Sequence, residues 1–500
     1  MSAPTEHIEV HLDDGYKWRA FSAIALSFFT MVMTMSMVFV ALSAIADDFG
    51  VSLRSASWVV ISEALVISAL LLPMGRFADI VGRKKIHMSG LAIFAVGAVL
   101  VAFAPTFWAL ILARIVMATG NAMSQSVGTA MVVAIFPAAE RGKAIGSQTT
   151  AVSVGGASGP IVAGLLLEVL PWEALFLLLL IPVSIAFVAA HFLLDEDRVS
   201  AGRDQIDGPF DWGGAIMSGL MVIVVVLTIN NPLAVSWFSP IILGGMALVG
   251  GLLTAFIRWE LNRDDPMLQL RLFKIPTFRL AVGTRLLGFM GSTTTRFLLP
   301  IFLISLRGMN EGAAGGLLFL ISLGMGISAQ SCGRLSDRVG TRPFTIVGLA
   351  LLAATGLAMG FMTASTNTMY LAVIVFISGL ANGMWNVPNN STILGSVPPA
   401  DLGVIGAFTN LTRTLGNVFG QAIASTVVVA VMVSQGFDIP LKDIDDIVGA
   451  DTAFTDGWRV AHFLLTGYAL AALALAIRTR PGTPLGQASA KQVTDTKKRH

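Results

Sequence analysis

The chain has 500 residues, of which 55% are hydrophobic and 12% are charged, and its mean hydropathy is +0.78. Soluble domains are usually about a quarter charged, so this composition excludes an ordinary soluble protein and predicts that most of the chain lies in lipid. The single cysteine, Cys332, excludes an intramolecular disulfide framework. The net charge of +2 is uninformative, whereas the distribution of the charges along the chain is not.

The hydropathy pattern predicts about fourteen membrane-spanning helices, because a spanning helix needs roughly 20 mainly apolar residues. The first six are predicted at 19–46, 54–74, 86–104, 107–132, 143–169 and 172–194. Two more follow a polar stretch at 195–211, and we expect them at 212–230 and 238–259. After a second polar stretch, the last six are predicted at 277–304, 312–332, 343–363, 368–395, 403–433 and 457–478.

Basic residues concentrate in loops on one side of the predicted membrane. With the N-terminus inside, the outer loops hold only Arg54, Arg307 and Lys442. The inner loops hold Arg76, Arg83, Lys84, Lys85, Arg141, Lys143, Arg198, Arg203, Arg263, Arg271, Lys274, Arg334, Arg338 and Arg342. This asymmetry predicts that both termini are cytoplasmic. The acidic outer loop at about 434–456 lacks the regular spacing and the glycine of a calcium loop, and it is interpreted as a solvated connector.

A short cationic motif occurs twice, as GRFADIVGRKK from Gly75 and as GRLSDRVGTR from Gly333. Its two glycines are expected to allow a tight turn between helices. The repeat continues at a similar offset, which places Gly142 on Gly403 and predicts two similar helical bundles. The predicted inner-gate residues are Gly75, Asp79, Gly82, Arg83, Gly333, Asp337, Arg338 and Gly340.

Five segments together resemble the fourteen-helix drug:proton antiporters of the major facilitator superfamily. They are the first copy of the repeated motif, LILARIVMATGNA from Leu110, GGASGPIVAG from Gly155, FDWGG from Phe210 and PMLQLRLFKIPTF from Pro266. The resemblance implies an all-α integral membrane fold, with two six-helix bundles and two inserted helices. The expected parts are a cytoplasmic tail at 1–18, a bundle at 19–194, a linker with the inserted helices at 195–276, a bundle at 277–478 and a disordered tail at 479–500.

The resemblance also assigns roles. Arg114 matches the arginine used in proton coupling, and the antiporter motif is expected to line the contact between the bundles through Gly155, Gly159, Pro160 and Gly164. The chain departs from the pattern in its first helix, where Thr34 stands at the place of an acid that many relatives carry. The proton and drug chemistry of the relatives is therefore not expected to transfer whole.

Ionisable groups inside a membrane are costly, so they are functional candidates. Glu63 lies deep in an apolar helix and is the predicted proton carrier, with Arg114 as its partner. Burial favours the neutral form of a carboxyl group and an arginine favours the charged form, so alternation between these settings moves a proton. A permanent ion pair that locks two helices is the alternative.

The ionisable candidates inside the predicted spans of the second bundle are arginines, which favours an anionic or zwitterionic substrate. Arg285 is nearer a helix end and is expected to snorkel to the membrane surface. Trp385 is expected to stack on a planar substrate, and Pro388 is expected to open its helix locally. The predicted substrate-binding residues are Arg296, Arg413, Asn121, Gln125, Gln148, Trp385, Asn386, Asn389 and Asn390.

These observations favour a secondary transporter in a bacterial inner or plasma membrane that exports small amphipathic compounds, including drugs, in exchange for protons. The first alternative is a carrier for a specific metabolite such as an organic anion or a vitamin, and the second is a non-transporting membrane sensor or scaffold. The sequence lacks a GxxxxGK[ST] motif, metal-ligand spacing and a basic aromatic stripe. We therefore expect no enzyme activity, cofactor, metal or nucleic acid, and a monomer in contact with lipid.

Overall fold

The computed structural model describes residues 14–200, 210–231, 235, 239–263, 266–398, 401–437, 447 and 449–479. Of the expected tails at 1–18 and 479–500, residues 1–13 and 480–500 lie outside the described residues, as do residues 438–446 of the acidic connector. Within the described ranges the chain is helical, and fourteen helices are long and apolar enough to cross a membrane. The predicted all-α membrane fold is therefore confirmed.

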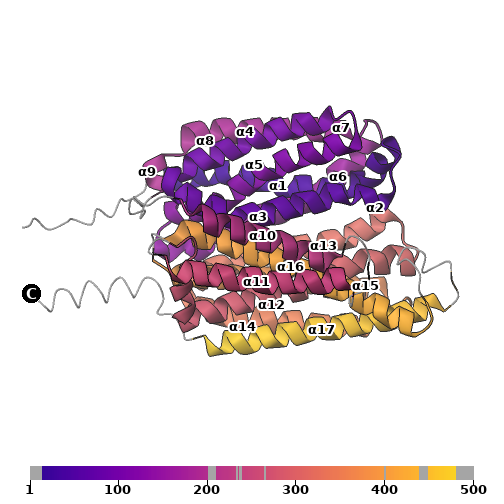
Figure 1. Ribbon diagram of the computed structural model, residues 1–500. Coiled ribbons are helices and arrows are strands. Elements are labelled where there is room, and N and C mark those ends of the chain that lie inside the picture. Colours follow the sequence, from indigo (N-terminus) through magenta and orange to yellow (C-terminus); the bar gives the residue numbers. More distant parts are fainter. Residues whose placement is uncertain are drawn as a thin grey trace, which may run out of the picture.

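Two bundles form the two halves of the molecule (Figure 1). The first half contains the long helices α1 (Asp14–Asp48), α3 (Trp58–Val81), α4 (Arg83–Ala102), α5 (Phe107–Ile135) and α6 (Arg141–Leu167). Its last span is divided into α7 (Glu173–Leu178) and α8 (Leu180–Leu193). Its short elements are α2 (Leu53–Ala56), η1 (Ala138–Glu140) and α9 (Glu196–Val199).

The second half repeats this arrangement. It contains α12 (Pro276–Ile301), α13 (Glu311–Val339), α14 (Thr341–Gly360), α15 (Thr368–Gly395), α16 (Leu402–Ser434) and α17 (Ala450–Arg478). The short elements η2 (Leu270–Lys274) and η3 (Phe302–Leu306) flank α12. Helix α15 continues through Pro388, so the predicted local opening is wrong, although a proline still removes one backbone donor from the helix.

The inserted helices α10 (Trp212–Asn230) and α11 (Pro240–Leu261) lie outside the two bundles at their junction (Figure 1). Helix α10 packs on α3 of the first half and on α16 of the second, whereas α11 packs on α10. The inserted pair thus bridges the halves on one side and leaves the interface between the bundles to other helices.

The repeated motif forms a turn of one residue in each copy. Gly82 separates α3 from α4 with φ +122, and Gly340 separates α13 from α14 with φ +99. Glycine is favoured there because it has no Cβ. The prediction that both glycines of each motif shape the turn is wrong for Gly75 and Gly333, which lie inside helices and allow close packing. We call the end of the molecule that carries these two turns the inner end.

Gly155 and Gly159 of the antiporter motif pack within the first bundle. A Cβ on Gly155 would lie 2.5 Å from the carbonyl oxygen of Phe29, and one on Gly159 would lie 2.6 Å from that of Met33, both in α1. Gly164 has nothing within 4 Å. Helix α6 does line the contact between the bundles, against α13, but the expectation that its antiporter-motif glycines form that contact is wrong for Gly155 and Gly159. Gly142 and Gly146 provide that close approach instead, against α13.

Candidate functional site

Glu63 of α3 and Arg114 of α5 form a buried ion pair in the first bundle. Their side chains are 2% and 0% exposed, and Nη2 of Arg114 donates to Oε2 of Glu63. Nε of Arg114 also lies 3.4 Å from the carbonyl oxygen of Val59. Such a pair persists in an apolar interior only when its desolvation is offset by close charges and hydrogen bonds. The sequence therefore identified two residues that the fold brings into direct contact.

A chain of hydrogen bonds leads from this ion pair to the second bundle. Asn121 Nδ2 donates to Glu63 Oε1 at 3.3 Å, and Gln125 Nε2 donates to Asn121 Oδ1 at 2.7 Å. Both side chains lie on one face of α5, because residues four apart are neighbours on a helix. Arg413 Nη2 of α16 then donates to Gln125 Oε1 at 3.1 Å. Four of the predicted site residues are thus linked across the bundle interface to Arg114.

Arg285 is a site residue that sequence reasoning undervalued. It is 3% exposed, so the expectation that it snorkels to the membrane surface is wrong. Its Nε donates to the carbonyl oxygen of Thr409 at 3.0 Å, and Nη1 donates to Asn386 Oδ1 at 2.9 Å. Its guanidinium also lies 5.0 Å from the centre of the Phe289 ring. Its distance from the start of α12 was the signal that could have identified it as buried.

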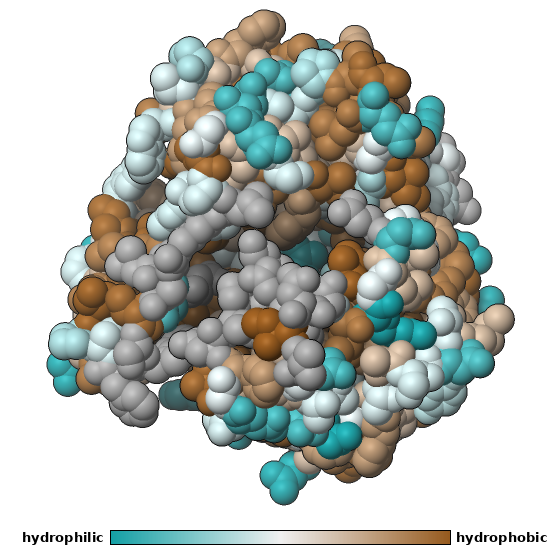
Figure 2. Space-filling view, turned by 90° about the vertical axis from the view of Figure 1, so that its right-hand side faces the viewer, coloured by the Kyte–Doolittle hydropathy of each residue, from teal (hydrophilic) through white to brown (hydrophobic). Residues whose placement is uncertain are grey.

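Arg296 is the accessible arginine of this region. Its side chain is exposed, and Nη2 lies 3.1 Å from Met325 Sδ of α13. Thr293, one turn before Arg296 on α12, donates to Asn417 Oδ1 of α16 at 2.6 Å, and Arg413 lies one turn before Asn417 on α16. Figure 2 looks onto the end opposite the inner end and shows a hollow between the two halves, with hydrophilic atoms inside it.

Several predicted substrate residues lie elsewhere. Trp385 is 0% exposed and packs on Gly288, Gly348 and Phe289, so the predicted stacking on a substrate is wrong. Gln148 donates to Thr129 Oγ1 at 2.9 Å and thus braces α6 on α5. Asn389 donates to the carbonyl oxygen of Ala281 at 3.1 Å.

Asn389 and Asn390 lie in the inner part of α15 and do not belong to the series of hydrogen bonds that links Glu63 to Arg413. Asn389 lines a cavity of about 300 Å³ whose wall also includes Asp337 and Arg342, near the inner end. Asn390 is 6% exposed, and its Oδ1 has no hydrogen-bond partner among the described residues. The polar run on α15 therefore separates into Asn386, which holds Arg285, and two residues that face other surroundings.

The inner end is closed by two acids that lie against helix N-termini. Asp337 accepts hydrogen bonds from the backbone N–H groups of Gly142 at 2.7 Å and Lys143 at 2.9 Å, in the first turn of α6. The Asp79 carboxylate lies against Gly403, in the first turn of α16. A helix N-terminus carries partial positive charge and favours such anions. Arg338 is exposed, so the expectation that it contributes to the gate is not supported.

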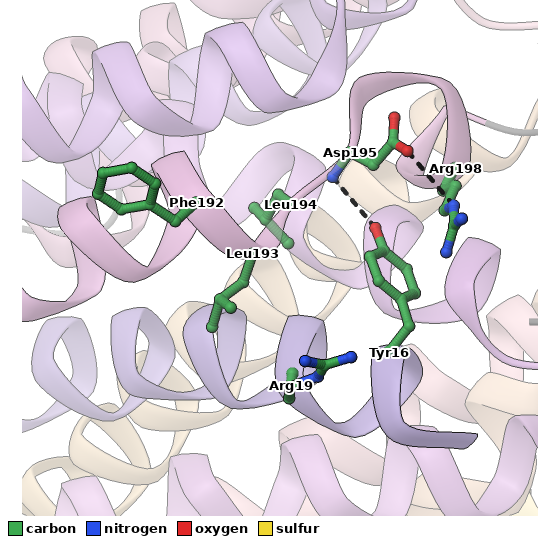
Figure 3. Close-up of a pocket in the computed structure, with 7 residues that line it drawn as sticks. All are labelled: Tyr16, Arg19, Phe192, Leu193, Leu194, Asp195 and Arg198. Atoms are coloured by element: carbon green, nitrogen blue, oxygen red, sulfur yellow. Dashed lines mark hydrogen bonds and ion pairs between the residues drawn. The ribbon is translucent and has the colours of Figure 1, made fainter. Parts of the chain in front are cut away.

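A second cavity of about 300 Å³ lies at the inner end of the first bundle (Figure 3). The backbone N–H of Asp195 donates to Tyr16 Oη at 3.1 Å, and Arg198 Nε donates to Asp195 Oδ2 at 3.3 Å. The Arg198 guanidinium also lies 4.5 Å from the centre of the Tyr16 ring. These contacts hold the segment after α8 on the start of α1. None of the predicted site residues lines this cavity.

Comparisons with known proteins agree with this architecture. The family model described as Major Facilitator Superfamily matches residues 24–421. The riboflavin transporter RibZ of Clostridioides difficile is 29% identical over 82% of this chain and 88% of its own length. The multidrug efflux pump LfrA of Mycolicibacterium smegmatis is 28% identical over 87% of this chain and 85% of its own length.

Solved structures show the same fold at lower sequence identity. The human organic anion transporter MFSD10 has a TM-score of 0.64 at 16% identity, with 91% of this chain and 99% of that chain covered. The proton:xylose symporter XylE has a TM-score of 0.66 at 13% identity, with 94% and 97% covered. At such identities the similarity concerns the arrangement of the helices and not the ligand.

Proposed function

Because the chain belongs to the major facilitator superfamily, we propose that it exports small amphipathic organic compounds in exchange for protons by alternating access. The observation that carries this proposal is the continuous polar chain from Arg114 through Glu63, Asn121 and Gln125 to Arg413. It connects a buried acid of one bundle to an arginine of the other. Rocking of the bundles must break or remake its last link, so movement and the acid are mechanically coupled.

Glu63 is the proposed proton carrier, and Arg114 controls it. A neighbouring arginine favours the ionised carboxylate, whereas burial without that arginine favours the protonated acid. Arg114 already contacts the carbonyl oxygen of Val59 and Met117 Sδ, and these groups can hold it when it leaves Glu63. A small shift of α5 against α3 therefore suffices to switch Glu63 between its ionised and its protonated form.

The proposed state of the molecule is outward-facing. The contacts of Asp337 with α6 and of Asp79 with α16 close the inner end, and the hollow of Figure 2 lies at the other end. If the inner end is cytoplasmic, as the basic loops indicate, both termini are cytoplasmic too. Opening the inner end requires the two acids to leave their helix N-termini, which supports their role as gate residues.

A carrier for a specific metabolite, such as an organic anion or a vitamin, is the second candidate. It is favoured by the three arginines at 285, 296 and 413, and one relative is named a riboflavin transporter. Export of drugs is favoured by LfrA, which is named a multidrug efflux pump, and by Stp of Mycobacterium tuberculosis, which is named a multidrug resistance protein.

The test is substrate-dependent proton movement in proteoliposomes that contain the purified full chain. A panel of cationic, neutral and anionic compounds is added while the internal pH is recorded. We expect proton movement in the wild type and its loss in Glu63→Gln, since the amide cannot carry a proton. Glu168→Gln is the matched control, because Glu168 is exposed at the end of α6. Equal proton movement in Glu63→Gln and the wild type would contradict the assignment.

A further inference from the structure

Three arginines of the second bundle have only uncharged partners. In the described part of the chain, Arg285 donates to Thr409 and Asn386, Arg413 donates to Gln125, and Arg296 contacts the thioether of Met325. A thioether sulfur is a weak acceptor. Each guanidinium has five N–H donors, so most donors of Arg296 and of Arg413 have no strong acceptor among the described residues.

No acid of the surrounding helices can balance these charges. The sequences of α5, α12, α15 and α16 contain neither aspartate nor glutamate, and α13, which contacts Arg296 through Met325, carries its acids only near its two ends, at Glu311 and Asp337. Glu63 is the nearest acid along the polar chain, and it already pairs with Arg114. Arg285 donates to Thr409, one turn before Arg413 on α16, and Thr293, one turn before Arg296 on α12, donates to Asn417, one turn after Arg413. The region therefore holds a local excess of positive charge.

Such an excess is costly in a medium of low dielectric constant, because each charge loses its hydration and repels its neighbours. An uncompensated intramembrane charge is expected to have a functional partner. If the three arginines served only to stabilise the fold, each would need a fixed negative partner, and the surrounding helices supply none beside them. The partner that completes the site must come from outside the chain and must be negative.

We propose that the central site binds an organic anion, a carboxylate or sulfonate, between Arg296 and Arg413. This inference rests on the proposed transport function and specifies the charge of its substrate. The exposed Arg296 meets the anion in the hollow between the halves, and the half-buried Arg413 forms the inner side of the site. Arg285, held by Asn386 and Thr409, contributes a fixed positive field from behind and is a positioning residue.

The bound anion replaces Gln125 as the partner of Arg413. Gln125 Oε1 is a neutral acceptor, and a carboxylate oxygen forms a stronger, charge-assisted hydrogen bond with a guanidinium. Release of Gln125 frees the end of the chain that leads through Asn121 to Glu63. Gln125 is therefore a competitor for the anion site, and its removal is expected to strengthen binding of the anion.

The test measures binding at equilibrium to the purified full chain in lipid nanodiscs, without a pH gradient. The probes are 2-naphthoate, 2-naphthamide and 2-naphthylmethylammonium, which share a ring system and differ in charge. We expect the anion to bind at least about tenfold more tightly than the amide, as for hydrogen bonds to a charged group. The ammonium is expected to bind most weakly, because the arginines repel it.

Variants separate the site from general effects. Arg296→Gln and Arg413→Gln should each weaken 2-naphthoate binding by about tenfold or more, and Arg296→Lys should restore part of the affinity. Gln125→Leu should tighten the binding. Arg279→Gln is the matched control, since Arg279 is exposed on the same helix as Arg296. If Arg413→Gln fails to fold, the variants at 296 and 125 still decide the question, because they predict opposite changes.

Equal affinity for the three probes, tighter binding of the ammonium, or an equal loss in Arg279→Gln would overturn the anion site. These outcomes do not depend on proton movement. Anion binding without proton-linked flux would reject the proposed function and retain the site, whereas proton-linked flux of cations without anion binding would do the reverse.

Discussion

The two halves of the inner gate each stabilise a carboxylate between the bundles, but they do so with different partners. In each half an acid from the repeated motif lies against the first turn of a helix from the other bundle. In the first half, Asp79 is 1% exposed and also binds Arg83, which is 0% exposed, at 3.1 Å. In the second half, Thr341 occupies the place of Arg83, and Asp337 relies on two backbone N–H groups.

The two halves of the gate also differ in how firmly the acid is held. Nη1 of Arg83 also donates to the carbonyl oxygen of Val199 at 3.3 Å, so the first half ties α3, α4 and α9 together around one buried ion pair. Thr341 shares a hydrogen bond of 2.7 Å with Thr392, within its own bundle. We infer that the Asp79 side of the gate is the more rigid, because Arg83 fixes the acid, whereas Asp337 is held by backbone N–H groups that water can replace.

The largest expected effect is that of Asp79→Asn. The change leaves the buried Arg83 without its carboxylate, and removal of one partner of a buried pair costs about 3–5 kcal/mol. We expect a marked fall in the thermal unfolding midpoint and near loss of flux, with membrane insertion retained. Asp47→Asn, at an exposed position in α1, is the control. Normal flux in Asp79→Asn would remove Asp79 from the gate.

A smaller effect is expected for Asp337→Asn. An asparagine oxygen can still accept one of the two backbone N–H bonds, and the loss of charge at a helix N-terminus costs about 1 kcal/mol. The loss of transport flux should be several-fold smaller than the loss in Asp79→Asn. Accessibility of Ser147→Cys, in a Cys332→Ala background, should rise, because Ser147 binds Gln330 across this contact. An effect as large as that of Asp79→Asn would erase the proposed difference between the halves.

The smallest effect concerns pH and Asp401, at the start of α16. Burial raises the pKa of Asp401, Arg76 opposes the rise and Asp79 adds to it, while Gln269 donates to its Oδ1 at 2.9 Å. A raised pKa favours the protonated form in the folded state. The corresponding stability is therefore present below the ordinary aspartate pKa and is lost as the pH rises through the raised pKa.

Asp401→Asn should flatten this dependence. The difference in thermal unfolding midpoint between about pH 4 and about pH 7 should be smaller in the variant than in the wild type. The comparison with Glu140→Gln, at the matching place in the other half, isolates the effect, because Glu140 is partly exposed and pairs with Lys17. Parallel pH profiles of Asp401→Asn and the wild type would contradict the burial of a titrating acid at this position.

Much of the fold could be predicted because the hydropathy of each segment, read along the sequence, shows where a membrane-spanning helix lies. The span predicted at 368–395 coincides with α15, and that at 212–230 coincides with α10. The first motif was expected to be a loop, yet α3 continues to Val81, because the motif's small and charged residues pack against α16. Hydropathy cannot reveal that a polar helix end is covered by a neighbouring helix.

The sequence alone determined the helix count, the duplication and the identity of the costly charges, because each depends on composition and spacing along the chain. It placed Glu63 and Arg114 among the candidates before any contact was known. Only the tertiary structure decided which charges meet: Arg285 turned inward to Asn386, Trp385 became core, and Arg413 reached across to Gln125. Side chains on separate helices acquire partners only when the helices pack, and linear spacing carries no record of that packing.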